Sequence, residues 1–400
     1  MRTDAKSSSG DDAARNLRRA EEALDALRER HLRRLGHVVP GTRIGAPAWP
    51  PAGRFGSRRR LTASWNYWWQ AHLVDLLADA AARGDRRAAG EARALLRGIR
   101  IRNAGRWRND YYDDMAWLAL AVERLDRHSA PPALLRHERA QRLFTGVFTD
   151  AWAPELGGGI PWRVTDHFFN VPANGPAGIF LARRGRLERA AQMSDWIAAT
   201  MLLPSGLIAD GEWLEADGSR RMVRNVYTYC QGVTLGLDLE LYRSTGQERF
   251  LNRMTALVAA VAGQLTTDGV IRGGGGGDGG LFAGILARYL ALIATDLPET
   301  APGGETLRRQ AASLVLASAE AAWEGRAEVA GRPLFAANWS RPAVIPDAAG
   351  AAGRFDGGAV GSSAVPERDL SVQLSAAMVL SAAASVTARS PEHTDTVTPD

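Results

Sequence analysis

The sequence contains very little cysteine and lysine. Cys230 is the single cysteine among 400 residues, so the chain cannot form an intramolecular disulfide. Lys6 is the single lysine, and the net charge of +5 therefore rests on arginines, which are scattered along the chain and mixed with Asp and Glu. This distribution is typical of a solvated surface, so no nucleic-acid partner is expected despite the basic balance.

Long apolar runs and strand-like patterns are also scarce. No apolar stretch reaches the roughly 20 residues that cross a bilayer, so no membrane span is expected. The first residues, with Asp4, Lys6 and Asp11, lack the apolar core of a signal peptide, which predicts a cytoplasmic protein. Strand-like sequence is confined to 206–226, where a small hairpin is expected around a Gly/Asp turn.

Motifs for several chemistries are missing as well. There is no serine nucleophile elbow and no cysteine pair, and His72 has no second ligand at metal-binding spacing. The glycine run 273–277 lacks the Gly-Lys-Ser/Thr ending of a phosphate-binding loop. The sequence therefore predicts no cofactor and no bound metal.

Helical periodicity, by contrast, covers most of the chain. Apolar residues recur at helical spacing in segments bounded by Gly and Pro. These segments are 12–35, 64–83, 86–99, 113–127, 134–150, 172–184, 186–200, 230–244, 247–265, 279–296, 304–324 and 368–386. Charge-poor segments alternate with charge-rich ones, as inner and outer helices would. We therefore expect an all-α fold, an α/α six-barrel in which six inner and six outer helices form a toroid. An open solenoid is the alternative, although no fixed repeat period supports it.

The expected domain organisation is simple. Residues 12–387 form one barrel domain, and the polar segments 1–11 and 388–400 are expected to be disordered tails. The charge-poor stretches expected to form the inner ring are 64–75, 113–122, 172–181, 230–239, 279–287 and 371–386. Long loops precede them, and loops of this kind at one end of a ring would build a single cleft.

Two adjacent carboxylates, Asp113 and Asp114, begin one of these inner helices. No charged residue occurs from Met115 to Val122, which indicates a buried helix. Acids at its first turn cost stability unless they are partnered or used in chemistry. They could simply complement the helix N-terminus. They could also be the acid/base and nucleophile of glycoside hydrolysis.

The spacing of the pair bears on the type of hydrolysis. Adjacent helical residues point about 100° apart, so the two carboxyl groups can flank one substrate bond. Retaining glycosidases hold their carboxyl groups about 5–5.5 Å apart, which neighbours in sequence reach more easily than the longer separation of inverting enzymes. The pair therefore favours retention.

The chain resembles glycoside hydrolase family 76, the endo-α-1,6-mannanases, over about 60–385. The segments that carry the resemblance are Tyr67-Trp68-Trp69-Gln70-Ala71-His72, Tyr111-Tyr112-Asp113-Asp114-Met115-Ala116-Trp117, Gly157-Gly158-Gly159-Ile160-Pro161-Trp162, Asn174-Gly175-Pro176-Ala177, Tyr227-Thr228-Tyr229-Cys230-Gln231-Gly232, Gly277-Asp278-Gly279 with Phe282, and Gln373-Leu374-Ser375.

The resemblance implies an α/α six-barrel glycosidase that cleaves α-mannosidic linkages, expected to be α-1,6, in mannan or manno-oligosaccharides. It implies Asp113 as the nucleophile and Asp114 as the general acid/base of a retaining reaction. Cys230 stands where the family usually has Asn. Because a thiol is a weak hydrogen-bonding group, a contact in or near the substrate site would be lost there.

Substrate-binding candidates are polar and aromatic residues of these motifs. They are Trp69, His72, Tyr112, Trp162, Asn174, Tyr229, Gln231, Asp278 and Trp339. Trp162, Tyr229 and Trp339 are the candidates for stacking on sugar rings. Asp278 could cap the helix that follows it, accept hydrogen bonds from sugar hydroxyls, or do both. His72 is expected in the core or the cleft.

Two other functions remain open at this point. A sugar epimerase or isomerase on the same fold would use histidines inside the barrel, and only His72 and His167 are near the expected cleft. A non-catalytic glycan-binding protein would keep the barrel without turnover, and Cys230 is compatible with that. The sequence predicts neither the oligomeric state nor endo or exo action.

Overall fold

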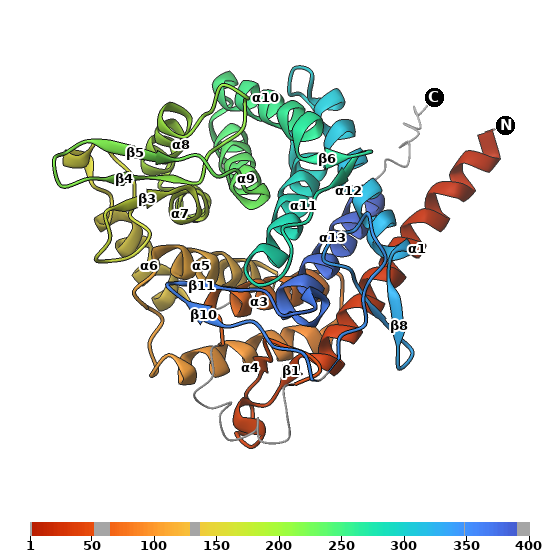
Figure 1. The fold of residues 1–400 in the computed structure, drawn as a ribbon. Helices are drawn as coiled ribbons and strands as arrows, with labels where there is room; N and C mark the ends of the chain where they lie inside the picture. Colours follow the sequence, from red (N-terminus) through yellow and green to blue (C-terminus); the bar gives the residue numbers. More distant parts are fainter. Residues whose placement is uncertain (1, 52–64, 129–136, 348, 390–400) are drawn as a thin grey trace.

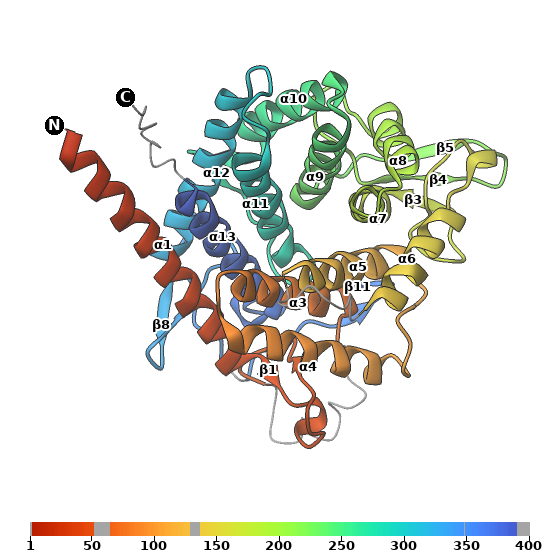
Figure 2. The same cartoon turned by 180° about the vertical axis from the view of Figure 1, so that it is seen from behind.

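The computed structural model describes residues 2–51, 65–128, 137–347 and 349–389. In this part of the chain, twelve α-helices make up the body of the molecule (Figure 1). Figure 2 shows the same body from behind, with the short strands lying outside the helical layers.

Six helices form an inner ring. They are α3 (Tyr67–Ala82), α5 (Tyr112–Arg127), α7 (Val171–Arg183), α9 (Thr228–Thr245), α11 (Gly279–Asp296) and α13 (Leu370–Ala388). Each packs against the next, and α13 packs against α3, which closes the ring. The predicted all-α six-barrel is therefore confirmed, and the open solenoid is excluded.

The outer layer consists of the other six described α-helices. They are α1 (Arg2–Arg30), α4 (Arg86–Arg102), α6 (Glu138–Asp150), α8 (Leu187–Thr200), α10 (Glu248–Gln264) and α12 (Gly304–Glu324). Each packs against an inner helix: α1 on α13, α4 on α3, α6 on α5, α8 on α7, α10 on α9, and α12 on α11.

Glycines allow the inner helices to approach one another closely. A Cβ on Gly236 would lie 2.3 Å from the Tyr289 ring of α11, and one on Gly284 would lie 2.7 Å from backbone atoms of Ser375 in α13. A side chain at either position would force these helices apart, because protein interiors are close-packed.

The strands are short and lie in the loops. They are β1 (Leu32–Arg33), β2 (Ile44–Gly45), β3 (Phe168–Asn170), β4 (Gly211–Leu214), β5 (Arg220–Val223), β6 (Thr266–Thr267), β7 (Val270–Ile271), β8 (Ala327–Val329), β9 (Arg332–Leu334), β10 (Phe355–Asp356) and β11 (Ala359–Val360). The expected hairpin exists as β4–β5, with Glu212 opposite Met222, and β3 extends it to three strands. Its first strand begins at Gly211 and not at 206–208, since Ile208 forms only an isolated bridge with Leu202.

The ends of the chain differ from the prediction of disorder at 1–11. Helix α1 begins at Arg2 and projects from the body at this end (Figure 1). No proline interrupts residues 2–11, so helical hydrogen bonding can continue backwards from the packed part of α1. At the other end α13 reaches Ala388, and residues 390–400 lie outside the described residues.

Two described helices are long and apolar enough to cross a membrane by length and composition, although the sequence suggested none. They are α11 and α13, and 67% and 83% of their apolar windows are buried inside the molecule. Both are inner helices of the barrel, where apolar sequence on all sides serves packing.

Buried ion pairs join three inner helices at their C-terminal halves. Asp75 and Asp79 of α3 bind Arg124 of α5 and Arg288 of α11, with Arg288 2.7 Å from Asp79 and 3.1 Å from Asp75. The two arginines hold the pKa of Asp79 below its usual range despite its burial. The first turns of the same helices, which carry Asp113, Asp114 and Asp278, lie at the other end of the barrel.

Candidate active site

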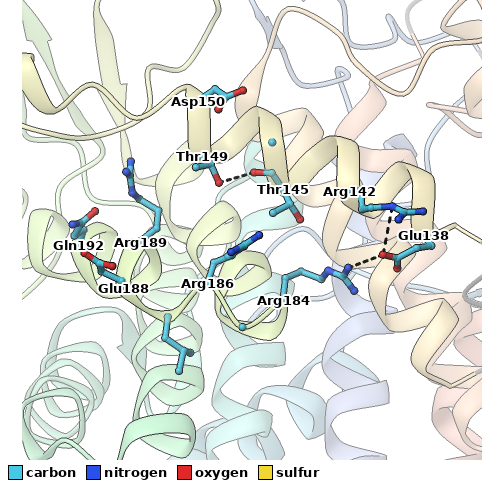
Figure 3. A pocket seen from close by; sticks show the side chains of 13 residues that line it. Glu138, Arg142, Thr145, Thr149, Asp150, Arg184, Arg186, Glu188, Arg189 and Gln192 are labelled. Carbon is cyan, nitrogen blue, oxygen red and sulfur yellow. Dashed lines mark hydrogen bonds and ion pairs between the residues drawn. The ribbon is translucent and has the colours of Figure 1, made fainter.

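A groove of about 880 Å³ lies on the outside of the barrel between α6 and α8 (Figure 3). One of its carboxylates, Glu138, is paired with Arg184 at 3.0 Å and with Arg142 at 3.7 Å. Asp113 and Asp114 do not line it. Because it lies on the outer surface and lacks the acid pair, this groove is not the candidate site.

The candidate site lies where the inner helices begin. Charged and aromatic side chains at these helix starts are half-buried. They are Trp68 of α3, Tyr112, Asp113 and Asp114 of α5, Tyr229 of α9, Asp278 directly before α11, and Phe282 of α11. Trp162, from the loop before β3, is half-buried beside them.

Asp113 is hydrogen-bonded through both carboxylate oxygens. Trp162 donates its indole N–H to Oδ2 at 3.0 Å, and the backbone N–H of Asp114 donates to Oδ1 at 2.8 Å. The loop and the helix are joined here a second time, since the N–H of Tyr112 donates to the Trp162 carbonyl at 2.9 Å. The position of Trp162 therefore determines how this carboxylate is held.

Asp114 has a different partner. Its Oδ2 accepts a hydrogen bond of 2.5 Å from the side-chain amide of Asn109, in the loop that enters α5. Neither acid caps the helix in the usual way: Tyr111 occupies the N-cap position and makes no side-chain cap bond. Asp113 complements the helix N-terminus in part, because the N–H that it accepts belongs to the first turn, whereas the side-chain bond of Asp114 goes to the loop.

Both acids have raised pKa values. Burial raises the pKa of Asp113 to about 7, partly offset by the N–H donors of Asp114 and Trp162. Burial and the neighbouring charge of Asp113 raise the pKa of Asp114 well above its ordinary value. The donors that face Asp113 favour its ionised form, and the charge of Asp113 opposes ionisation of Asp114.

Asp278 is a third carboxylate of the site, and it occupies the N-cap position of α11. Its Oδ1 accepts the indole N–H groups of Trp69 at 2.9 Å and Trp68 at 3.1 Å. Its Oδ2 accepts the N–H of Val360 at 2.6 Å. The carboxylate thus makes no side-chain cap bond to α11, although the residue stands where a cap was expected. Burial raises its pKa to about 6, and its charge raises the pKa of both Asp113 and Asp114.

A hairpin made of β10 and β11 crosses this end of the barrel. Val360 N–H binds Asp278 on one side, and Gly358 lies against Trp162 on the other, where a Cβ would come within 2.6 Å of the indole. Gly358 also has a φ of +101°, which favours glycine. The hairpin, drawn in blue in front of α5 in Figure 1, therefore forms one wall of the site.

Aromatic rings form the remaining walls. Tyr229 stacks on Phe282 with ring centroids 4.0 Å apart and nearly parallel planes. Trp162 meets Tyr111 edge to face at 5.4 Å, and the Arg163 guanidinium covers it at 4.9 Å. Tyr112 is half-buried beside the acids, and burial raises the pKa of its hydroxyl.

Three predicted substrate-binding residues are buried. Trp69 is 1% exposed and supports Asp278, and Trp339 is 3% exposed in the apolar core. His72 is 3% exposed between the rings of Trp68 and Trp117, and burial lowers its pKa to about 3. Their burial leaves none of the three rings accessible to a substrate.

Asn174 and Gln231 are also buried, and their amides bind backbone groups. Asn174 accepts the N–H of Ile160 and donates to the carbonyls of Ile160 and Asn170. Gln231 binds Ile208 and the Tyr227 carbonyl in the same way. With these bonds made, neither amide is offered to a sugar, so we leave both out of the proposed substrate contacts.

Asp210 is a site carboxylate that the sequence analysis missed. It is half-buried, and burial raises its pKa to about 6. Its charge adds to burial in raising the pKa of the Tyr229 hydroxyl. Its side-chain contact is the Cys230 thiol at 3.8 Å, a weak donor at the position where an Asn was expected. The sequence analysis included this residue only in the segment 206–226, where a hairpin was expected, and did not single out its carboxylate.

These features define a class of protein: an α/α barrel with several buried carboxylates and aromatic rings at one end. In the described residues, no group of three or more His, Cys, Asp or Glu side chains is arranged to hold a metal ion. Carboxyl pairs with separated pKa values are the acid/base equipment of glycoside hydrolysis.

Comparison with known proteins agrees with this class. The model of Glycosyl hydrolase family 76 matches residues 55–352, so the chain belongs to this family and is a glycosidase. Among solved structures, the GH76A alpha-1,6-mannanase from Salegentibacter sp. HEL1_6 is 28% identical, with a TM-score of 0.72 over 92% of this chain and 98% of that one. The Lin0763 protein from Listeria innocua is 27% identical, with a TM-score of 0.71 over 91% and 95%.

More distant structures share the fold alone. Dfg5 from Chaetomium thermophilum is 18% identical, with a TM-score of 0.60 over 80% of each chain. No curated protein matches the chain.

Proposed function

We propose that the protein hydrolyses α-1,6-mannosidic linkages of mannan or manno-oligosaccharides with retention of anomeric configuration. The observation that carries this is the pair Asp113 and Asp114 at the end of the barrel where the inner helices begin, with different hydrogen-bond donors and raised pKa values. One carboxyl that ionises first and one that keeps its proton are what a retaining double displacement requires.

In this mechanism Asp113 attacks the anomeric carbon as the carboxylate and forms a glycosyl-enzyme ester. Asp114 donates its proton to the departing glycosidic oxygen, so that the leaving sugar departs neutral. The Asp114 carboxylate then takes a proton from water, which attacks the anomeric carbon and releases Asp113. The site returns to its starting protonation state.

The relatives support the substrate class. The Salegentibacter enzyme is an alpha-1,6-mannanase, and an inactive variant with two consecutively numbered aspartates replaced by asparagine is known in complex with alpha-1,6-mannotriose. Asp113 and Asp114 are likewise consecutive. Tyr112, Trp162, Tyr229 and Asp278, all half-buried at the open end, are the side chains that we propose contact the sugars.

The structure offers less for an epimerase. His72 is buried and its pKa is about 3, so it stays uncharged at neutral pH and lies under the ring of Trp68. His167 is exposed in the loop before β3. Neither histidine is half-buried beside the acid pair, as the acid/base of an epimerase would be.

The decisive experiment is product analysis by proton NMR with α-1,6-mannan and a panel of mannobioses. We expect shorter α-1,6 oligosaccharides, with the α-anomer appearing first and mutarotating later. A β-anomer as the first product would exclude retention. Binding of mannotriose without any turnover at high protein concentration would favour the non-catalytic alternative.

The proposed roles also predict a pH profile of kcat/KM. Asp113 acts deprotonated and its pKa is about 7, so activity should be lost as the pH falls through about 7. Asp114 acts protonated and its pKa is raised, so the alkaline limb should lie at higher pH. Initial rates from pH 4 to 10 test this prediction, and full activity maintained down to pH 4 would contradict it.

A further inference from the structure

Four of the six inner helices carry a buried side-chain amide at their fourth residue. The amides belong to Gln70 of α3, Asn174 of α7, Gln231 of α9 and Gln373 of α13. The other two inner helices lack such an amide. The fourth residue is Met115 in α5, whose first turn carries Asp113 and Asp114, and Phe282 in α11, which directly follows Asp278. We call the four amides the loop clamps.

Each loop clamp makes the same three bonds. Asn174 accepts the N–H of Ile160 at 2.8 Å and donates to the carbonyls of Ile160 and Asn170, both at 2.8 Å. Gln373 repeats this with the N–H of Phe335 at 3.0 Å and the carbonyls of Phe335 and Glu367 at 2.9 Å. One loop residue is thus held at both backbone groups.

The held loop residues lead to neighbouring helices of the ring. Two residues after Ile160, the Trp162 carbonyl accepts the N–H of Tyr112, the first residue of α5. Two residues after Ile208, the Asp210 carbonyl accepts the N–H of Val171, the first residue of α7. Gln70 holds Gly45, and two residues later the Pro47 carbonyl accepts the N–H of Leu370, the first residue of α13.

A loop clamp on one helix therefore positions a residue that contacts the neighbouring helix. Asn174 of α7 holds Ile160, and two residues later Trp162 donates its indole N–H to Asp113 and accepts the N–H of Tyr112 with its carbonyl. Helix α5 has no loop clamp of its own, so its entry depends on the neighbouring helix.

We propose that Asn174 is a positioning residue that acts through Ile160 and Trp162 to hold the carboxylate of Asp113 in its working orientation. This inference rests on the proposed function, because it gives Asp113 its role as the ionised group. A hydrogen bond weakens steeply with misalignment, so a small displacement of the indole is enough to weaken its bond to the carboxylate.

The test compares the pH profiles of kcat/KM on α-1,6-mannan for wild type, Asn174→Ala, Trp162→Phe and the double variant. Losing the indole donor disfavours the ionised carboxylate, so the acid limb should move up by about one pH unit in each single variant. Because both changes remove the same interaction, the double variant should move no further than Trp162→Phe alone.

Gln373→Ala is the matched control, since it removes an equivalent loop clamp whose loop leads toward Ala337. It should lower the unfolding temperature to a similar extent without moving the acid limb. If Asn174→Ala does not fold, Asn174→Gln keeps the amide but lengthens the side chain, and Gln373→Asn is its counterpart. Asn174→Gln should then move the limb in the same direction, while Gln373→Asn should not.

The outcomes separate the inference from the proposed function. An unchanged acid limb in the Asn174 variants, with Asp113→Asn inactive, overturns the positioning role and leaves the function in place. Equal shifts in the Asn174 and Gln373 variants also overturn it, because the effect would then be general. Wild-type activity in Asp113→Asn removes the proposed function itself.

Discussion

Asp113→Asn and Asp114→Asn should each lower the turnover of α-1,6-mannan by at least about 10³-fold. The first variant loses the attacking carboxylate, and the second loses the proton donor and the base. Asp110→Asn is the matched control, because Asp110 is an exposed acid at the same helix entry. It should retain activity near that of wild type.

A second substrate distinguishes the two roles. A dinitrophenyl α-mannoside needs little protonation of its leaving group, so Asp114→Asn should still form the glycosyl-enzyme and transfer the sugar to added azide. Asp113→Asn should not react with it, since the attacking group is missing. Wild-type turnover of mannan in both variants would show that the assignment is wrong.

Arg124→Met should lower the free energy of unfolding more than a change of an exposed residue does. It leaves the carboxylates of Asp75 and Asp79 in the interior with Arg288 as their remaining close cation in the network. Breaking a buried ion pair by removing one partner costs about 3–5 kcal/mol. The unfolding midpoint in heat or urea measures this loss.

Arg127→Met is the matched control for this change. Arg127 lies three residues later on α5, and its side chain is 44% exposed where it pairs with Glu123. Exposed pairs contribute about 0–1 kcal/mol, so its midpoint should stay near that of wild type. Equal losses in the two variants would contradict a special contribution of the buried pairs.

The helices were predictable because their signals are local. Predicted and observed bounds agree at both ends for 279–296 and 304–324, where Gly residues stand at the start and charged residues at the end. Most other ends moved by a few residues, but the segment predicted as 12–35 is Arg2–Arg30 in the structure, after which the chain enters β1. Low charge predicted most of the inner helices because they are buried on all sides. Helix α5 is the exception, since four of its six charged residues stand at its C-terminal end.

The candidate site was only partly predictable. Asp113 and Asp114 stood out as acids before an apolar helix, and their place at the open end follows from the helix order. For Asp278 a helix cap and a sugar contact were both open, because its partners Trp68, Trp69 and Val360 are distant in sequence. Asp210 was not singled out within the segment expected to form a hairpin, and its proximity to Cys230 depends on the packing of α9.

The sequence alone therefore determined the all-α barrel and its acid pair, because periodicity, charge and helix order are local properties. The tertiary structure decided which polar residues face the site and which support it. Asn174 and Gln231 have the chemistry of sugar-binding residues, but backbone groups bind the side-chain N–H donors and the carbonyl oxygen of each amide. Which partners satisfy a buried amide depends on packing between distant segments, and no local pattern encodes that packing.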